Sequence, residues 1–371
     1  MYSVFEEVIV INYSFPAVKG LQSRSEYYIA MVPIKLLGKL FVDEQEHVDP
    51  EFRAQRQLNE KRLPDMKRYI LLNLDNYVFS AISASIDGEF EFITSNKDAN
   101  IGVLEISMDA TLLINDGQHR KAALLMAFSE CNELGDETIS VVFYGDQGLV
   151  RSQQIFTDLN KHAVKVPNSI AELYDTRNEI AVVTREVLNG VPFLNKYTNK
   201  EKDILGKYSS CLFTLSTICN ANRTILKRCT DVSEQKEFLI SYWNSVVENI
   251  TLWKELENRE ISKIELRNKY IICQAIVIKA FGYLGKHFFE NNSEEFDKQL
   301  IKLTEIDWSR NGAHWQLRNI NENGKIIVNN SSIVLTNNYI KMVLGIPLTK
   351  DEEEKERKYT IKWNINYDKL R

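Results

Sequence analysis

The chain lacks a cysteine framework. Its five cysteines are odd in number, none occurs in the first 130 of the 371 residues, and most have apolar neighbours. Cys211, Cys219 and Cys229 are spaced too widely for paired zinc ligands, and no histidine pair stands near them. We therefore expect reduced thiols in core positions, and neither a disulfide scaffold nor a structural metal.

A basic leader and a long hydrophobic run are also missing. The segment MYSVFEEVIVINYSF carries acidic residues where a signal peptide would be basic, and it is typical of a strand. The most apolar later stretch, residues 270–285, is short and is interrupted by Gln274 and Lys279. Both features predict a cytoplasmic protein that is neither secreted nor inserted in a membrane.

An excess of positive charge is absent, because the formal net charge is -5 at pH 7. Such a chain does not coat nucleic acid or anionic membrane through bulk electrostatics, so any contact with DNA has to be local. What the sequence does contain is ordinary for a globular protein, with 44% hydrophobic and 10% aromatic residues. This composition fills the cores of two or three domains.

The organisation of the chain changes near residue 150. Before it, β-branched and helical runs alternate, and after it helical periodicity dominates. We therefore expect an α+β, or mixed, fold with an α/β domain over 1–165 and a mainly α-helical domain over 166–371. The charge run KDEEEKERK (350–358) is typical of a solvated helix face or a linker. Strands are expected over 6–13, 26–34, 77–86, 102–108, 111–115 and 138–145, and helices over 49–73, 118–134, 149–160, 168–189, 233–258 and 263–290.

The segment TLLINDGQHRKAALLMAF (111–128) places a polar junction between a strand and a helix. Asp116 and Gly117 make the turn, and the helix begins near Gln118, where Asp116 is placed to cap it. A helix N-terminus that follows a glycine turn offers backbone N–H groups and the positive end of the helix dipole. The junction therefore predicts a small anion site.

His119 and Arg120 lie in the first turn of this helix. A positive side chain near the positive end of the helix dipole destabilises the helix by roughly 0.3–1 kcal/mol, so we expect an anion that compensates their charge. A phosphate group fits this set of donors. The alternative is a surface capping turn in which both side chains are incidental.

Two other segments carry candidate site residues. In residues 151–177, Asp158, Asn160 and Lys161 project from a helical pattern whose simpler interpretation is a helix surface with a C-terminal cap. Residues 52–68 contain six cations against two carboxylates, a local charge of +4, which fits either a solvated helix or a strip that faces phosphates. The cations of this basic strip are Arg53, Arg56, Lys61, Arg62, Lys67 and Arg68.

NDGQHR resembles the signature of the DGQHR family, and the surrounding pattern resembles its DndB branch, which serves in DNA sulfur modification (phosphorothioation). The resemblance implies a ParB/sulfiredoxin-like fold for the DGQHR part, in which Gly117, His119 and Arg120 match the motif that binds the phosphates of a nucleotide or DNA. It extends over nearly the whole chain, through QRQLN, NDGQHRKAAL, SQQIFTDLNKHAVKVPNSIAELYD, LFTLSTI, IDWSRNGAHWQLR and LTNNYIKMVLGIPLT.

The resemblance implies a bacterial transcriptional regulator, usually a repressor, that binds double-stranded DNA at the promoter of its own phosphorothioation gene cluster. The basic strip would then contact DNA phosphates, together with Lys196, Lys200 and Lys202. The sulfur transfer itself is not attributed to such proteins, which agrees with the lack of a cysteine ligand cluster and of a Walker-type glycine loop. The sequence shows no clear helix-turn-helix, so it does not identify the surface that contacts DNA.

A nucleotide-dependent enzyme, an ATPase or a DNA nickase, is the alternative function. Asp116, Asp158 or Asn160 would then orient water or hold Mg²⁺. The two functions are compatible, because a nucleotide switch could gate DNA binding. In this alternative ATP or another nucleotide binds to Gly117, Gln118, His119, Arg120, Asn160 and Lys161, and the catalytic residues are Asp116, His119, Arg120 and Asp158.

A third interpretation is a scaffold for the other phosphorothioation proteins. Residues 306–318 carry Trp308 and Trp315, which are residue types found at interfaces, although burial of both in the core is the simpler expectation. We also expect a homo-oligomer.

Overall fold

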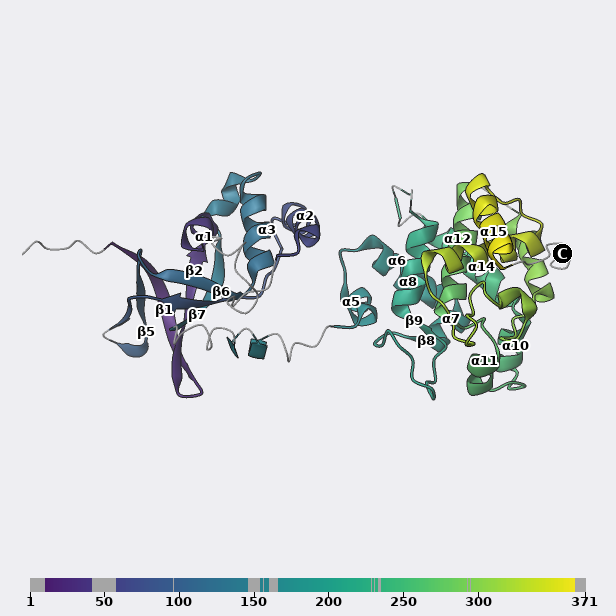
Figure 1. Cartoon of the computed structure of the whole chain (residues 1–371), viewed down its shortest axis with the longest axis horizontal. Coiled ribbons are helices and arrows are strands. Elements are labelled where there is room, and N and C mark those ends of the chain that lie inside the picture. Colours follow the sequence, from purple (N-terminus) through teal and green to yellow (C-terminus); the bar gives the residue numbers. More distant parts are fainter. Residues whose placement is uncertain are drawn as a thin grey trace, which may run out of the picture. The chain divides into compact units, whose positions relative to one another are not determined.

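The computed structural model describes residues 11–41, 58–95, 97–145, 154–155, 157–159, 166–227, 229, 231–232, 235–291, 293 and 295–363. The chain divides into two compact units, residues 1–164 and 165–371, and each has a hydrophobic core of its own (Figure 1). The first unit combines a sheet with helices and the second is mainly helical. The fold is therefore mixed α+β, as the sequence predicts.

The first unit is built on a seven-stranded sheet with the strand order β4-β5-β1-β2-β7-β3-β6. Neighbouring strands run antiparallel except β3 and β7, which are parallel. The strands are β1 (Asn12–Gln22), β2 (Ser25–Pro33), β3 (Ile82–Asp87), β4 (Phe90–Ser95), β5 (Asp98–Ser107), β6 (Thr111–Asp116) and β7 (Thr138–Gly145).

One face of this sheet is covered by α1 (Ile34–Leu40), α2 (Leu63–Leu71) and α3 (Gln118–Phe128), as Figure 1 shows. Side chains alternate between the two faces of a strand, so every second residue of a strand enters this core, as Ala30 and Val32 of β2 do. Two 3₁₀ helices, η2 (Glu60–Arg62) and η3 (Asn132–Asp136), complete the layer.

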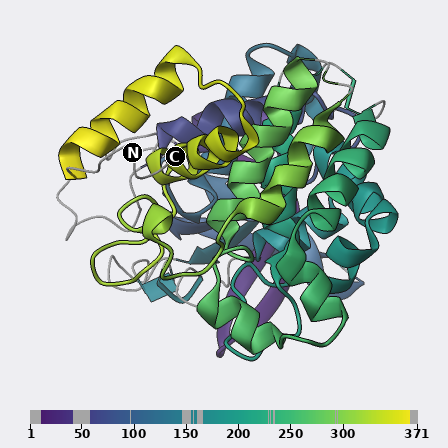
Figure 2. The ribbon, with the colours of Figure 1, turned by 90° about the vertical axis from the view of Figure 1, so that its right-hand side faces the viewer.

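The second unit packs around the apolar helix α12 (Ala275–Glu290), whose neighbours include α8 (Leu215–Ile225) and α14 (Asn330–Leu344). At Gly282 a Cβ atom would lie 2.9 Å from the Cα of Ala221, so glycine lets α12 approach α8 closely. Figure 2 turns this bundle toward the viewer. Its other elements are α5 (Asn168–Tyr174), α6 (Glu179–Gly190), α7 (Pro192–Tyr197), β8 (Thr198–Asn199), β9 (Phe213–Thr214), α8 (Leu215–Ile225), α9 (Lys236–Glu248), α10 (Thr251–Glu257), α11 (Lys263–Lys269), α13 (Phe296–Leu300), η5 (Ile301–Glu305), η6 (Ala313–Trp315), α14 (Asn330–Leu344) and α15 (Lys350–Trp363).

The long helices expected from periodicity are interrupted in the structure. The helix predicted over 168–189 is α5 and α6, because Asp175 accepts hydrogen bonds from two backbone N–H groups and Asn178 caps α6. The helix predicted over 263–290 breaks after α11, where the N–H of Ile271 bonds to the carbonyl of Trp308. Contacts with the local turn and with a distant segment thus override the helical period.

The first unit also differs from the sequence expectation in detail. The strand predicted over 77–86 begins only at Ile82, and the sequence analysis anticipated neither α1 nor β4. The strand predicted over 6–13 lies largely outside the described residues, and β1 continues to Gln22. Of the helix predicted over 149–160, only residues 154–155 and 157–159 are described, and these are helical.

The charge run 350–358 is helical and most of its side chains are exposed, which confirms a solvated helix face with Glu356 as its one buried residue. It forms most of α15, and the side chain of Glu356 is only 2% exposed because Arg318 binds it. Trp308 and Trp315 are buried in the core of the second unit. This confirms the simpler expectation for the two residues, which was burial and not exposure at an interface.

All five cysteines are free thiols, and Cys219 and Cys273 are buried. Burial raises the pKa of each of these two thiols to about 12, which keeps both protonated and inert at neutral pH. In the part of the chain that the structure describes, no helix has the length and apolar character needed to cross a membrane.

Candidate functional site at the DGQHR turn

The strand, turn and helix predicted over 111–128 are present as β6, Gly117 and α3. Gly117 adopts φ +109°, in the left-handed region that side chains other than glycine rarely adopt. A Cβ atom there would lie 3.0 Å from both Arg120 Nη2 and Ile82 Cγ1. Both the backbone conformation and the lack of space therefore require glycine at this position.

Asp116 does not cap α3, so that prediction is wrong. Gly117 occupies the N-cap position and, as a glycine, supplies no side-chain cap. The carboxylate of Asp116 turns instead toward Arg120, which donates from Nη2 to Oδ2 over 2.8 Å. The anion expected to compensate the cationic side chains at this helix N-terminus is thus supplied in part by the carboxylate of Asp116.

Arg120 is held at two points. Besides Asp116 it donates to the hydroxyl of Ser80, and its side chain is 17% exposed. Its Nε is buried and has no hydrogen-bond partner among the described residues. The guanidinium therefore stands at a fixed place beside the turn, with one of its donors uncommitted.

His119 connects the motif to the basic strip. Its Nε2 accepts a hydrogen bond of 2.9 Å from the backbone N–H of Asn59. A ring nitrogen that accepts carries no proton, so the imidazole is neutral in this arrangement. Asn59 also caps η2, and η2 contains Lys61 and Arg62. The first turn of α3 and these two exposed cations therefore lie next to each other.

The other members of the basic strip are partly neutralised. Lys67 pairs with Glu130 over 2.6 Å and Arg68 pairs with Asp65 over 3.0 Å. Lys61 and Arg62 form no ion pair with another described residue. The remaining two cations, Arg53 and Arg56, lie outside the described residues.

The sequence of this chain matches the model of the DndB family, described as DNA-sulfur modification-associated, over residues 15–347. The chain belongs to the DndB family. This family places the protein in a DNA sulfur modification system. No curated protein and no solved structure matches the chain significantly.

The structure of this DndB-family chain brings only some of the predicted site residues together. Gly117, Gln118, His119 and Arg120 share one turn, whereas Asn160 and Lys161 lie outside the described residues. Asp158 accepts a hydrogen bond from Gln154 over 2.6 Å. No hydrogen bond or ion pair between described residues joins Asp158 to the motif, and its catalytic role stays a prediction.

Two of the three lysines predicted to contact DNA in the second unit, Lys196 and Lys200, have side-chain partners within the protein. Lys196 pairs with Glu257 over 3.2 Å, and Lys200 donates to the side chain of Asn195 over 3.0 Å. The described residues contain no group of three or more histidine, cysteine or acidic side chains placed to hold a metal ion. A Mg²⁺ ion beside Asp116 would therefore depend on oxygens from nucleotide phosphates and water.

Sequence reasoning missed two residues of this DndB site, Ser80 and Asn59. Ser80 lies 40 positions before Arg120 in an ordinary stretch, and no local pattern marks it. Asn59 lies 60 positions before His119. Asn59 is the last residue of the QRQLN block on which the family resemblance rests, and this block was the one indication in the sequence that Asn59 belongs to the site.

Proposed function

We propose that this protein is a DNA-binding transcriptional repressor of a phosphorothioate-modification gene cluster. In this proposal the DGQHR turn and η2 together contact the DNA backbone. The observation that carries the proposal is the hydrogen bond from the Asn59 N–H to His119 Nε2, because it fixes two exposed cations beside a helix N-terminus whose N-cap residue is glycine.

The donors at this place suit a phosphate. The N-cap residue of α3 is Gly117, which supplies no side-chain cap, and at a helix N-terminus of this kind a phosphate oxygen can accept from the backbone N–H groups. Arg120 stands beside the turn, and Lys61 and Arg62 add two cations against the single carboxylate of Glu60 in η2. The surface is locally positive in a chain whose net charge is negative.

The proposal is tested by fluorescence anisotropy with duplex DNA from the promoter of the protein's own gene cluster, over a series of salt concentrations. We expect affinity to fall steeply as salt rises, because phosphate contacts release counterions. The double variant K61E/R62E should bind less tightly and lower the salt slope by about 2, or about 1 for each phosphate that the variant no longer binds.

Lys97→Glu is the control, because Lys97 is exposed in the β4–β5 turn and its replacement reverses one positive charge away from the motif, which is half of the charge change in the double variant. It should leave the salt slope unchanged. Wild-type protein that gives no salt-sensitive shift on promoter DNA would exclude the repressor function.

The alternative proposal is a nucleotide-dependent enzyme that uses the same turn. The half-exposed carboxylate of Asp116 favours it, since a carboxylate next to a phosphate site suits Mg²⁺. Against a role as base, Nε2 of His119 is engaged by Asn59. Calorimetry with ATP and CTP, on wild type and Arg120→Ala, separates the two proposals, because only the enzyme requires nucleotide binding that depends on Arg120.

A further inference from the structure

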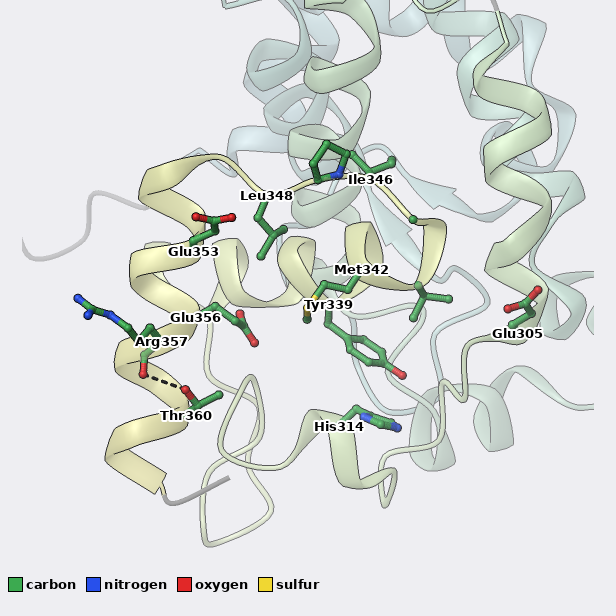
Figure 3. A pocket seen from close by; sticks show the side chains of 13 residues that line it. Glu305, His314, Tyr339, Met342, Ile346, Leu348, Glu353, Glu356, Arg357 and Thr360 are labelled. Atoms are coloured by element: carbon green, nitrogen blue, oxygen red, sulfur yellow. Dashed lines mark hydrogen bonds between the residues drawn. The ribbon is translucent and has the colours of Figure 1, made fainter. Parts of the chain in front are cut away.

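A large pocket lies in the second unit between α14, the segment 345–349 and α15 (Figure 3). Its volume is about 1040 Å³, at the upper end of the roughly 300–1,000 Å³ that ligand sites usually have. Two late segments quoted for the family resemblance, IDWSRNGAHWQLR and LTNNYIKMVLGIPLT, supply most of its lining. The pocket lies in the second unit, so the DNA binding proposed for the first unit does not explain it.

The wall formed by α14 and the segment after it is apolar. Met342 and Val343 are half-buried, Ile346 is buried, and Pro347 and Leu348 continue the surface into the connection to α15. Leu348 lines the pocket and is not one of the residues that form the hydrophobic core of this unit. Such a wall favours apolar side chains of a ligand.

Two exposed carboxylates face the pocket, and the ammonium of Lys302 lies near Gly345 at its edge. Glu305 and Glu353 are exposed and lie at opposite ends of the pocket in Figure 3. Arg357 also lines the pocket, but its guanidinium points away from Tyr339 in the same view. The two acidic ends disfavour DNA phosphates as the ligand of this pocket.

The floor of the pocket adds no positive charge. His314 stacks on Tyr339 with ring centroids 4.7 Å apart, and burial and the charge of Arg318 lower the pKa of His314. Its imidazole is therefore neutral at pH 7. The carboxylate of Glu356 is neutralised by Arg318, which donates to its two oxygens over 2.5 and 3.0 Å.

The second wall, α15, is positioned by buried polar contacts. Besides the Arg318–Glu356 pair, Lys341 donates to both oxygens of Glu352 over 2.9 Å. Asn338 donates to Glu356 and to the carbonyl of Glu352. Because such bonds are directional, they set the position of α15 against α14 more narrowly than an apolar contact would. The pocket is therefore preformed.

We propose that this pocket binds a segment of a partner protein in which apolar side chains are flanked by basic ones. The apolar wall would receive the central side chains, and Glu305 and Glu353 would pair with the basic residues at the two ends. The size of the pocket suits several side chains at once.

The test uses full-length protein and a fluorescein-labelled synthetic peptide with a leucine- and methionine-rich centre and an arginine at each end. The matched probe carries glutamate at each end. We expect saturable binding of the basic peptide and binding of the acidic peptide weaker by about tenfold or more, since charge complementarity selects between them.

Leu348→Glu and Glu353→Lys should each weaken binding of the basic peptide several-fold. Glu354→Lys is the matched control, because Glu354 is the neighbouring exposed acid of α15 and does not line the pocket. Glu353 is exposed, so its variant tests the proposal even if Leu348→Glu folds poorly.

Equal binding of the two peptides, no binding of the basic one, or binding unchanged by both pocket variants would overturn the proposal. Promoter DNA binding is measured on the same samples and should be unaffected by the pocket variants. The outcome is therefore independent of the function proposed for the first unit.

Discussion

An arginine is paired with a carboxylate both at the DGQHR turn and beside the pocket of the second unit, and these two pairs differ in exposure. In the first unit Arg120 and Asp116 have side chains 17% and 46% exposed, whereas in the second Arg318 and Glu356 are 1% and 2% exposed. An exposed pair exchanges partners at little cost, while a buried pair loses its only compensation when one member is removed. The first arrangement suits binding of an anion and the second suits fixed positioning of a helix.

Removing one member of the buried pair should have the largest effect. Glu356→Gln leaves the charge of Arg318 buried without its carboxylate and should lower the free energy of unfolding by about 3–5 kcal/mol. All five tryptophans lie between residues 243 and 363, so tryptophan fluorescence in a urea titration reports on the second unit alone.

The control for this variant replaces both members of the pair. Arg318→Met together with Glu356→Leu leaves no unpaired charge and should recover most of the lost stability. A loss below about 1 kcal/mol in Glu356→Gln would show that water or a neighbouring group compensates Arg318, and would remove the distinction between the two pairs.

Gly117→Ala should have the next largest effect, because it places a Cβ 3.0 Å from Arg120 in a left-handed backbone. We expect a loss of about 1–3 kcal/mol, measured by thermal denaturation followed with circular dichroism, together with weaker DNA binding. Gly324→Ala is the matched control, since Gly324 also has a positive φ of +70° but no atom within 4 Å of its added Cβ. Equal losses in both variants would attribute the effect to backbone strain alone.

Asp116→Asn should change binding more than stability. A partly exposed ion pair contributes at most about 1 kcal/mol, so the melting temperature should move little. Without the carboxylate, Arg120 is available to a phosphate, and we expect promoter DNA to bind several-fold more tightly. Weaker binding by this variant in the anisotropy assay would mean that Asp116 positions Arg120 and does not compete with the phosphate.

The smallest effect should be a pH dependence confined to the second unit. Burial lowers the pKa of His314 and of His287, so the unfolded chain binds these protons first as pH falls. The stability that the neutral rings contribute is complete above the ordinary histidine pKa of about 6.5 and decreases below it. Urea titrations at pH 7.5 and 5.5 should show this loss, and His314→Gln should reduce it. An unchanged pH dependence in the variant would assign the loss to other groups.

The difference between local patterns and contacts with distant residues explains how much of the site the sequence could predict. The junction at 111–128 follows from local rules, because a β-branched run, a glycine turn and a helical period are adjacent in the chain. The partners of that junction are not local: Ser80 and Asn59 lie 40 and 60 positions away from the residues they bind. Composition and periodicity carry no information on such pairings.

The burial of Glu356 within the charge run 350–358 has the same origin. A run of charges is normally solvated, and only the position of Arg318, 38 residues earlier, buries Glu356. The run did contain a signal, since Glu352, Glu356 and Tyr359 recur at helical spacing on one face of α15. That spacing indicates a face with a partner, although it does not identify the partner.

The place of β7 in the sheet has a consequence for synthesis of the protein. β7 joins β2 on one side and β3 on the other, so two partial sheets, β4-β5-β1-β2 and β3-β6, meet only through the strand of this sheet that is synthesised last. Until residue 145 has emerged, both partial sheets present an open edge. A nascent chain that pauses before this strand is therefore the form most exposed to aggregation.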